Sequence, residues 1–104
     1  MSKRKRTLQR ADDRAQQKLG RDLEKLALLA AGGSPERALV ITSPAEVEVQ
    51  AGAARCPVCQ GELRVEEHTA ETIAGARLRV ARVVCVVCRR KRAIYFRLAG
   101  TLVN

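Results

Sequence analysis

Residues 56–59 and 85–88 read Cys56-Pro57-Val58-Cys59 and Cys85-Val86-Val87-Cys88, and the architecture expected for the chain follows from these two stretches. They hold all four cysteines of the 104-residue chain, and the 25 residues 60–84 separate them. A gap of two residues lets the backbone turn so tightly that both sulfur atoms of a pair face one point. Two such turns brought together give the tetrahedron of thiolates that Zn²⁺ prefers, with bonds of about 2.3 Å. The spacing therefore predicts a metal site whose ligands are Cys56, Cys59, Cys85 and Cys88.

The residues around the cysteines predict three antiparallel strands. Apolar and polar side chains alternate after the first pair, before the second pair and over residues 94–98. Ala74-Gly75 fits a two-residue turn, so the chain is expected to run out and back and to return the second pair to the first. The facing residues are then Ile73 and Ala76, Thr69 and Val80, Glu67 and Arg82, and Val65 and Val84. One face of this hairpin is predicted to collect Leu63, Val65, Ile73, Leu78, Val80 and Val84.

This arrangement resembles the zinc-ribbon family over residues 56–98. The resemblance rests on residues 56–63, a turn or knuckle that runs into a strand, on the second cysteine pair, and on the strand over residues 93–98. It implies a three-stranded antiparallel sheet with a knuckle at one end and one structural Zn²⁺. The chain departs from the commonest form at one point. Gln60-Gly61 follows the first pair but Arg89-Arg90 follows the second, which therefore lacks a glycine two residues past its last ligand.

Three other uses of the cysteines compete with zinc. Two disulfides suit an exported protein, but no apolar segment of signal-peptide length follows the basic N-terminus. Iron accepts the same soft thiolates, and spacing alone does not separate it from zinc. A redox-active pair is disfavoured because the motif occurs twice without a strand and helix beside it. Four thiolates close the coordination sphere of zinc, and no nucleophile with an adjacent base is found, so we expect a protein that is not an enzyme.

The positive charge is concentrated at the two ends of the sequence. The chain has 20 Lys and Arg against 11 Asp and Glu, a net charge of +9. Residues 1–10 carry five basic and no acidic side chains, and so do residues 89–104. Basic clusters rich in arginine suit phosphate contact, whereas a solvated surface and an acidic protein partner are the alternatives. The candidate nucleic-acid-binding residues are Lys3, Arg4, Lys5, Arg6, Arg89, Arg90, Lys91 and Arg92.

The N-terminal third predicts a long amphipathic helix over residues 7–31. Leu19, Leu23, Leu26 and Ala30 recur at spacings of four, three and four, and Gly32-Gly33 ends the pattern. Residues 1–6 are expected to form a disordered basic arm and residues 32–55 an extended connector, with strand-like stretches over 38–42 and 46–50. The helix is expected either to cover the apolar face of the ribbon or to pair with another protein or a second copy of the chain.

The predicted fold class is α+β: a three-stranded antiparallel zinc ribbon over residues 56–104, preceded by a long N-terminal helix and an extended connector. Aromatic residues make up only 2% of the chain, so its hydrophobic core is expected to be small and to need stabilisation by the metal. The longest apolar runs, residues 26–31 and 83–88, are far shorter than the about 20 residues that cross a bilayer. We therefore expect a cytoplasmic protein without a membrane segment.

The predicted function is that of a small zinc-ribbon module associated with nucleic acid in transcription or translation. The alternative is a protein-interaction adaptor with a structural zinc and a docking or dimerising helix. No small-molecule substrate is expected. His68 is the only histidine, and a second metal site with Glu67 or Glu71 competes with an exposed residue on the hairpin.

Overall fold

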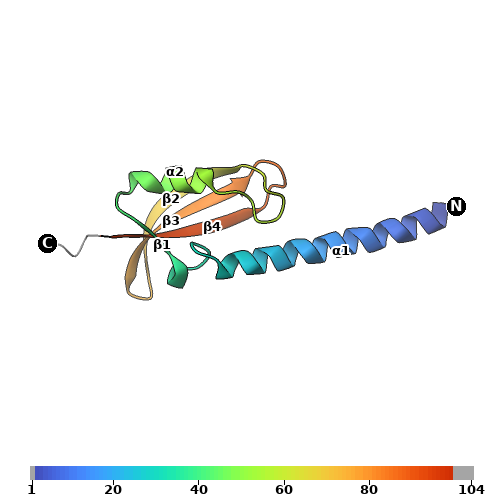
Figure 1. Ribbon diagram of the computed structural model, residues 1–104, viewed down its shortest axis with the longest axis horizontal. Coiled ribbons are helices and arrows are strands. Elements are labelled where there is room, and N and C mark those ends of the chain that lie inside the picture. Colours follow the sequence, from blue (N-terminus) through green and yellow to red (C-terminus); the bar gives the residue numbers. More distant parts are fainter. Residues whose placement is uncertain (1, 100–104) are drawn as a thin grey trace.

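A long helix and a four-stranded mixed sheet make up the computed structural model, which describes residues 2–99, with side chains from residue 6 onward (Figure 1). In chain order the elements are α1 (Ser2–Leu29), the short 3-10 helix η1 (Pro35–Arg37), β1 (Leu39–Ile41), α2 (Ala45–Ala53), β2 (Leu63–Ile73), β3 (Ala76–Cys85) and β4 (Lys91–Leu98). The molecule extends 72 × 23 × 16 Å because α1 projects away from the sheet. The predicted α+β class and the long N-terminal helix are both present.

The sheet contains the three predicted antiparallel strands and one more. The strand order is β1-β4-β3-β2, and β1 lies parallel to β4, with Leu39 beside Phe96 and Ile41 beside Leu98. The prediction of a purely antiparallel three-stranded ribbon is wrong in this respect. The strand-like stretch predicted over residues 38–42 does contain β1, but its pairing with β4 was not predicted, because that pairing joins residues far apart in the chain.

The β2–β3 hairpin has the predicted turn and, near the turn, the predicted register. Ile73 faces Ala76, Thr69 faces Val80 and Glu67 faces Arg82. The register shifts between Val65 and Glu67, so Val65 faces Val83 instead of Val84. One extra residue in a strand reverses which side chains point to each face of the sheet.

The shift splits the apolar face that the sequence predicted. Leu63 and Val65 lie on the α2 side of the sheet with Ala81, Val83 and Cys85. The remaining strongly buried members of the predicted set lie on the opposite face: Leu78, Val80 and Val84. Strand β3 is therefore buried on both faces, as expected for a strand that lies between two others.

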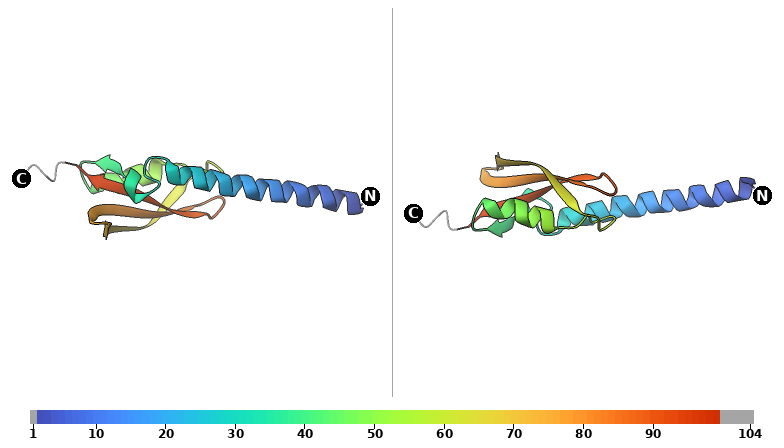
Figure 2. Two further views of the ribbon diagram at one scale, coloured as in Figure 1. Left: turned by 90° about the horizontal axis from the view of Figure 1, so that it is seen from below. Right: turned by 90° about the horizontal axis from the view of Figure 1, so that it is seen from above.

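Helix α2 covers one face of the sheet, where an extended connector was predicted. Val47 and Ala51 are four residues apart and fully buried, whereas Val49 is 71% exposed. Figure 2 shows α2 lying against one face of the sheet. The core beneath it includes Ile41, Phe96 and Ile94. The alternation of Glu and Val over residues 46–50 imitates a strand, but only the residues at helical spacing are buried.

Helix α1 does not cover the apolar face of the ribbon, which was one of the two alternatives that the sequence left open. Leu19 is 58% exposed, Leu26 is 61% exposed and Ala30 is also exposed, while Leu23 is half-buried. The helix begins at Ser2, so residues 2–6, predicted to be a disordered arm, are helical. Within the part of the chain that the structure describes, no helix combines the length and apolar character that crossing a membrane requires.

Candidate metal centre

The four cysteines meet where two knuckles come together. The first knuckle, residues 56–61, lies between α2 and β2, and the second, residues 85–90, joins β3 to β4. The Sγ atoms of Cys56 and Cys88 are 3.6 Å apart, those of Cys59 and Cys85 are 3.4 Å apart, and all four lie within 4.8 Å of one another. Bonds of about 2.3 Å to a tetrahedral zinc require sulfur atoms about 3.8 Å apart. The predicted ligands are therefore brought together at a spacing that could hold a metal ion.

The two knuckles share one pattern of backbone hydrogen bonds. In the first, the Gln60 amide donates to the Cys56 carbonyl at 2.9 Å, and the Cys56 amide donates to the Gly61 carbonyl at 3.0 Å. The second knuckle repeats both bonds: the Arg89 amide donates to the Cys85 carbonyl at 3.0 Å, and the Cys85 amide donates to the Arg90 carbonyl at 2.9 Å. The left-handed residue is the first one past each pair, Gln60 with φ 63° and Arg89 with φ 67°. The second turn is thus as tight as the first without a glycine.

Gly61 is needed for a different reason, the close approach of the two knuckles. A Cβ atom at this position would lie 2.8 Å from Cγ2 of Val87 and 2.9 Å from Sγ of Cys85. The corresponding residue of the second knuckle is Arg90. Its side chain can be accommodated because it extends toward α1.

Hydrogen bonds around the sulfur atoms favour thiolates. The amides of Cys88 and Val87 each donate to Sγ of Cys85 at 3.4 Å, and both bonds hold the pKa of the Cys85 thiol below its usual value. The backbone amide of Arg90 and then its guanidinium lower the pKa of Cys88. The pKa of Cys59 is raised because its sulfur lies against that of Cys85. Thiolates are the form that a metal ion binds, so the backbone prepares two of the four ligands for it.

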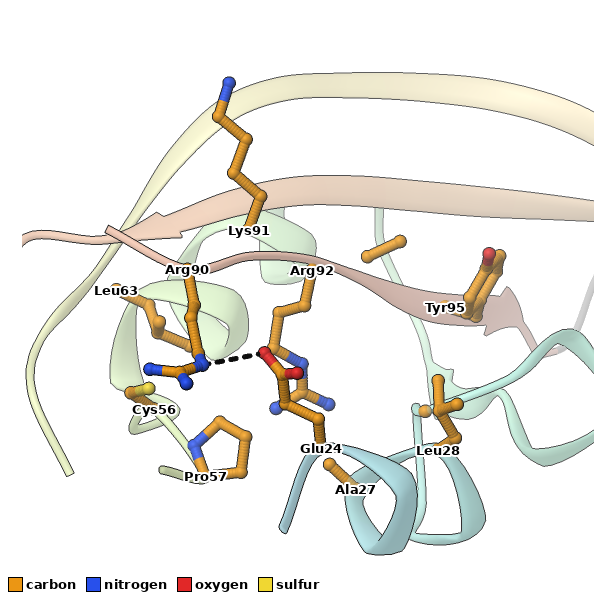
Figure 3. A pocket seen from close by; sticks show the side chains of 12 residues that line it. Glu24, Ala27, Leu28, Cys56, Pro57, Leu63, Arg90, Lys91, Arg92 and Tyr95 are labelled. Atoms are coloured by element: carbon orange, nitrogen blue, oxygen red, sulfur yellow. Dashed lines mark ion pairs between the residues drawn. The ribbon is translucent and has the colours of Figure 1, made fainter. Parts of the chain in front are cut away.

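The cations that follow the last ligand do not form one surface. Arg90 pairs with Glu24 of α1 through Nε at 3.0 Å, and Lys91 pairs with Glu66 at 3.7 Å. Arg92 is half-buried and points to the face opposite Lys91, whereas Arg89 is exposed (Figure 3). The four candidate residues after the last cysteine therefore point in different directions, because successive residues of a strand point to opposite faces. Of the N-terminal candidates, Arg6 is exposed on α1, and the side chains of Lys3, Arg4 and Lys5 lie outside what the structure describes.

A second group of cations was missed by the sequence analysis. Five exposed basic residues follow one another along α1 at spacings of four, four, three and four: Arg10, Arg14, Lys18, Arg21 and Lys25. This spacing places them on one side of the helix. Among the ion pairs of the described residues, none involves these five side chains. The sequence analysis counted charge by segment, which does not show how basic residues are arranged around a helix. A search for basic residues at helical spacing would have found this row.

Helix α1 passes over both knuckles at Gly20. A Cβ atom there would lie 2.7 Å from Nη2 of Arg90 and 3.7 Å from Cγ1 of Val58. Gly20 is buried, although a glycine within a helix costs about 1 kcal/mol against alanine. Its place in the sequence is explained by the close approach of the helix to the metal site.

His68 belongs to neither of the two predicted environments. It is half-buried on the α2 side of the sheet, with Nδ1 3.8 Å from Oε2 of Glu48, and its Nε2 is buried without a hydrogen-bond partner. Glu67 and Glu71 pair instead with Arg82, at 3.6 and 2.7 Å. These two glutamates face away from His68, so a second metal site with them is not formed.

The four-cysteine cluster is consistent with a zinc-ribbon-like site, and geometry alone supports that likeness. Comparison of the chain with protein-family models, with curated proteins and with solved structures found no match.

Proposed function

We propose that the chain is a small zinc-binding module that binds nucleic acid through the basic side of α1. The observation that carries the proposal is the row of five exposed cations without acidic partners from Arg10 to Lys25. At 1.5 Å per residue this row is about 22 Å long, enough to follow several phosphates of one strand. In this proposal the zinc holds the ribbon, and the ribbon fixes the direction of α1 through the contacts at Gly20 and Glu24.

The charges at the start of α1 support an anionic partner. The first turn of the helix contains no acidic residue, although carboxylates stabilise that end of a helix. Four basic residues follow Ser2 in the sequence, and the helix dipole is positive at this end. Phosphate groups would offset the positive charge at this end of the helix, so we expect the helical content of α1 to increase when a polyanion binds.

Titration against duplex and single-stranded DNA and RNA at several salt concentrations tests the proposal. The triple variant R10Q/R14Q/K18Q removes three cations from the row, and each lost phosphate contact lowers the salt slope on duplex DNA by about 0.9. We expect a slope reduced in magnitude by about 2 to 3. The variant R64Q/R77Q/R79Q removes the same charge from β2 and β3 and serves as the control. Equal effects of the two variants, or no binding at low salt, would overturn the proposal.

Zinc is the metal we propose for the cluster. Four thiolates with hydrogen-bonded sulfur atoms suit a closed tetrahedral site. Elemental analysis of the purified protein is expected to give one zinc per chain. Stoichiometric iron would assign the same cysteines to an iron site.

The exposed leucines of α1 favour a second candidate function, a protein-interaction adaptor. Leu8, Leu19 and Leu26 are each more than half exposed, and helical spacing places them on a different side from the basic row. The variant L19D/L26D is expected to abolish self-association or partner binding and to retain the metal. If association and nucleic-acid binding are both unaltered in this variant, the leucines are not a docking surface.

A further inference from the structure

The net charge of the cysteine cluster requires compensation. Four thiolates carry four negative charges and a divalent ion two positive ones, which leaves a dianionic centre. Cys56 and Cys85 are buried, next to the apolar core beneath α2. Charge in such a place is destabilising unless cations or hydrogen-bond donors surround it. The backbone amides of the second knuckle supply part of this compensation.

Arg90 approaches the cluster from the second knuckle. Its carbonyl accepts the hydrogen bond from the Cys85 amide, and its side chain turns back across the knuckle toward α1. The interaction with the Cys88 sulfur raises the pKa of the Arg90 guanidinium, so each group stabilises the charge of the other. Glu24 holds the guanidinium from the opposite side at 3.0 Å.

Arg92 approaches the cluster from the side of the first knuckle. It lines a cleft of about 360 Å³ between β4 and α1 together with Cys56, Pro57 and Leu63 (Figure 3). Its guanidinium is half-buried, and no carboxylate of the described residues forms an ion pair with it. Burial lowers its pKa, while the charge of Cys56 acts in the opposite direction. Cys56 and Arg92 thus line the same cleft.

We propose that Arg90 and Arg92 offset part of the negative charge of the metal centre and thereby strengthen the binding of a metal ion by the four cysteines. Because Arg90 also pairs with Glu24, these three side chains together add one positive charge beside the cluster. Arg89 and Lys91 lie outside this arrangement, since Arg89 is exposed and the side chain of Lys91 points away from the cleft (Figure 3). The inference rests on the metal site of the proposed function and is independent of nucleic-acid binding.

The same arginines were predicted from the sequence to contact phosphate. A phosphate group that entered the cleft would approach the dianionic centre and the carboxylate of Glu24, and like charges repel. The charges around Arg92 therefore favour a metal-directed role.

Zinc affinity, measured by competition with a chelator, tests the proposal on the full chain. Loss of an outer-shell partner of a metal ligand typically weakens binding 10- to 100-fold, so we expect R92Q and R90Q each to lower affinity by about 10-fold. R89Q is the matched control. It removes one charge from the same knuckle and introduces the residue that the first knuckle already holds at the corresponding position, Gln60 with φ 63°. R89Q is expected to retain wild-type affinity, and R92K most of it.

Two spectroscopic measurements separate charge compensation from a general loss of structure. All variants loaded with Co²⁺ are expected to show the absorption of a tetrahedral thiolate site, which establishes that the cluster still forms. With iron bound, the reduction potential of R92Q is expected to be lower than that of R89Q, because removing a positive charge favours the ferric state. Equal zinc affinities and equal potentials in R92Q and R89Q would overturn the inference. So would R92Q that loses nucleic-acid binding with its zinc affinity intact, whereas failure of the wild-type chain to bind any metal would remove the site itself.

Discussion

Single residues determine how closely the two knuckles approach each other. Gln60 and Arg89 take the left-handed conformation that each turn requires, and both tolerate it although neither is glycine. Gly61 is required because it has no side chain: the second knuckle occupies the space where a Cβ atom would lie. At this site the demand for glycine comes from packing and not from the turn.

Gly61→Ala tests this account. The added methyl group would contact Val87 and the sulfur of Cys85 at less than van der Waals distance, and overpacking of this kind costs about 1 to 3 kcal/mol. We expect a lower free energy of unfolding and weaker metal binding. Gly52→Ala is the control, since nothing lies within 4 Å of its Cβ position in α2. A Gly to Ala change within a helix is expected to stabilise by about 0.5 to 1 kcal/mol. Chemical denaturation of both variants gives the comparison, and G61A as stable as G52A would contradict it.

Glu46 gives the protein a defined response to acid. Its carboxylate accepts hydrogen bonds from the hydroxyl of Thr42 and from the amides of Thr42 and Ser43 at 2.6 and 2.8 Å, which lowers its pKa from 4.5. A carboxyl group whose pKa is lower in the folded state stabilises that state at pH values above its unfolded pKa. This contribution is lost as the pH falls through the lowered pKa.

The variant E46Q is therefore expected to be less stable than the wild type above pH 4.5, and the difference is expected to shrink below that pH. Urea unfolding at a series of pH values measures it. Both proteins have the same cysteines, so release of metal in acid affects them alike. A difference that is constant across the pH range would show that the Glu46 charge has no such role.

At the scale of elements, α2 shows how a short segment can mislead. Residues 46–50 alternate charged and apolar side chains, which predicts a strand. In the structure the segment is a helix, because Val47 and Ala51 are four residues apart and both reach the core beside Ile41 and Phe96. Val49, which a strand would bury together with Val47, is exposed.

Alanine substitutions in α2 distinguish the helix from the predicted strand. Val47→Ala removes two buried methyl groups, and each buried carbon deleted costs about 0.5 to 1.5 kcal/mol. We expect a loss of about 1 to 3 kcal/mol in the free energy of unfolding. Val49→Ala, made at a position that is 71% exposed, is expected to stay within about 0.5 kcal/mol of the wild type. Equal losses at the two positions would support the strand.

At the scale of the whole molecule, the metal is expected to be the largest single contribution to stability. The core beneath α2 contains one aromatic side chain, Phe96, and is otherwise aliphatic apart from the cysteines. Metal binding contributes roughly 10 to 16 kcal/mol in small zinc modules, against a net stability of about 5 to 15 kcal/mol for a typical domain. Removal of the metal is therefore expected to unfold the entire sheet.

Chelation is expected to unfold the ribbon reversibly. The near-ultraviolet signal of Tyr95 and Phe96 should disappear when a strong chelator is added and return when Zn²⁺ is restored, with thiols kept reduced throughout. A variant with Cys88 replaced by serine should show a weakened response. A sheet that survives chelation unchanged would show that the hydrophobic core alone maintains the fold.

The sequence by itself determined the candidate metal ligands, the β2–β3 hairpin near its turn and the long N-terminal helix. Each is a local signal: two cysteines separated by two residues, the Ala74-Gly75 turn, and leucines at helical spacing. Ligand chemistry and backbone periodicity act over a few residues, so these features are readable without knowing what packs against them. The charge pair of Glu67 and Arg82 followed from the same local register.

Only the tertiary structure decided the rest, because the deciding contacts join residues far apart in the chain. Strand β1 exists through its pairing with β4, and α2 is helical through the core that it covers. The irregularity between Val65 and Glu67 moves Leu63 to the face that α2 buries. The arginines after the last cysteine point in different directions because β4 alternates its side chains and because Glu24 lies opposite Arg90. None of these partners lies near in sequence, and local patterns contain no information about which distant surface will satisfy them.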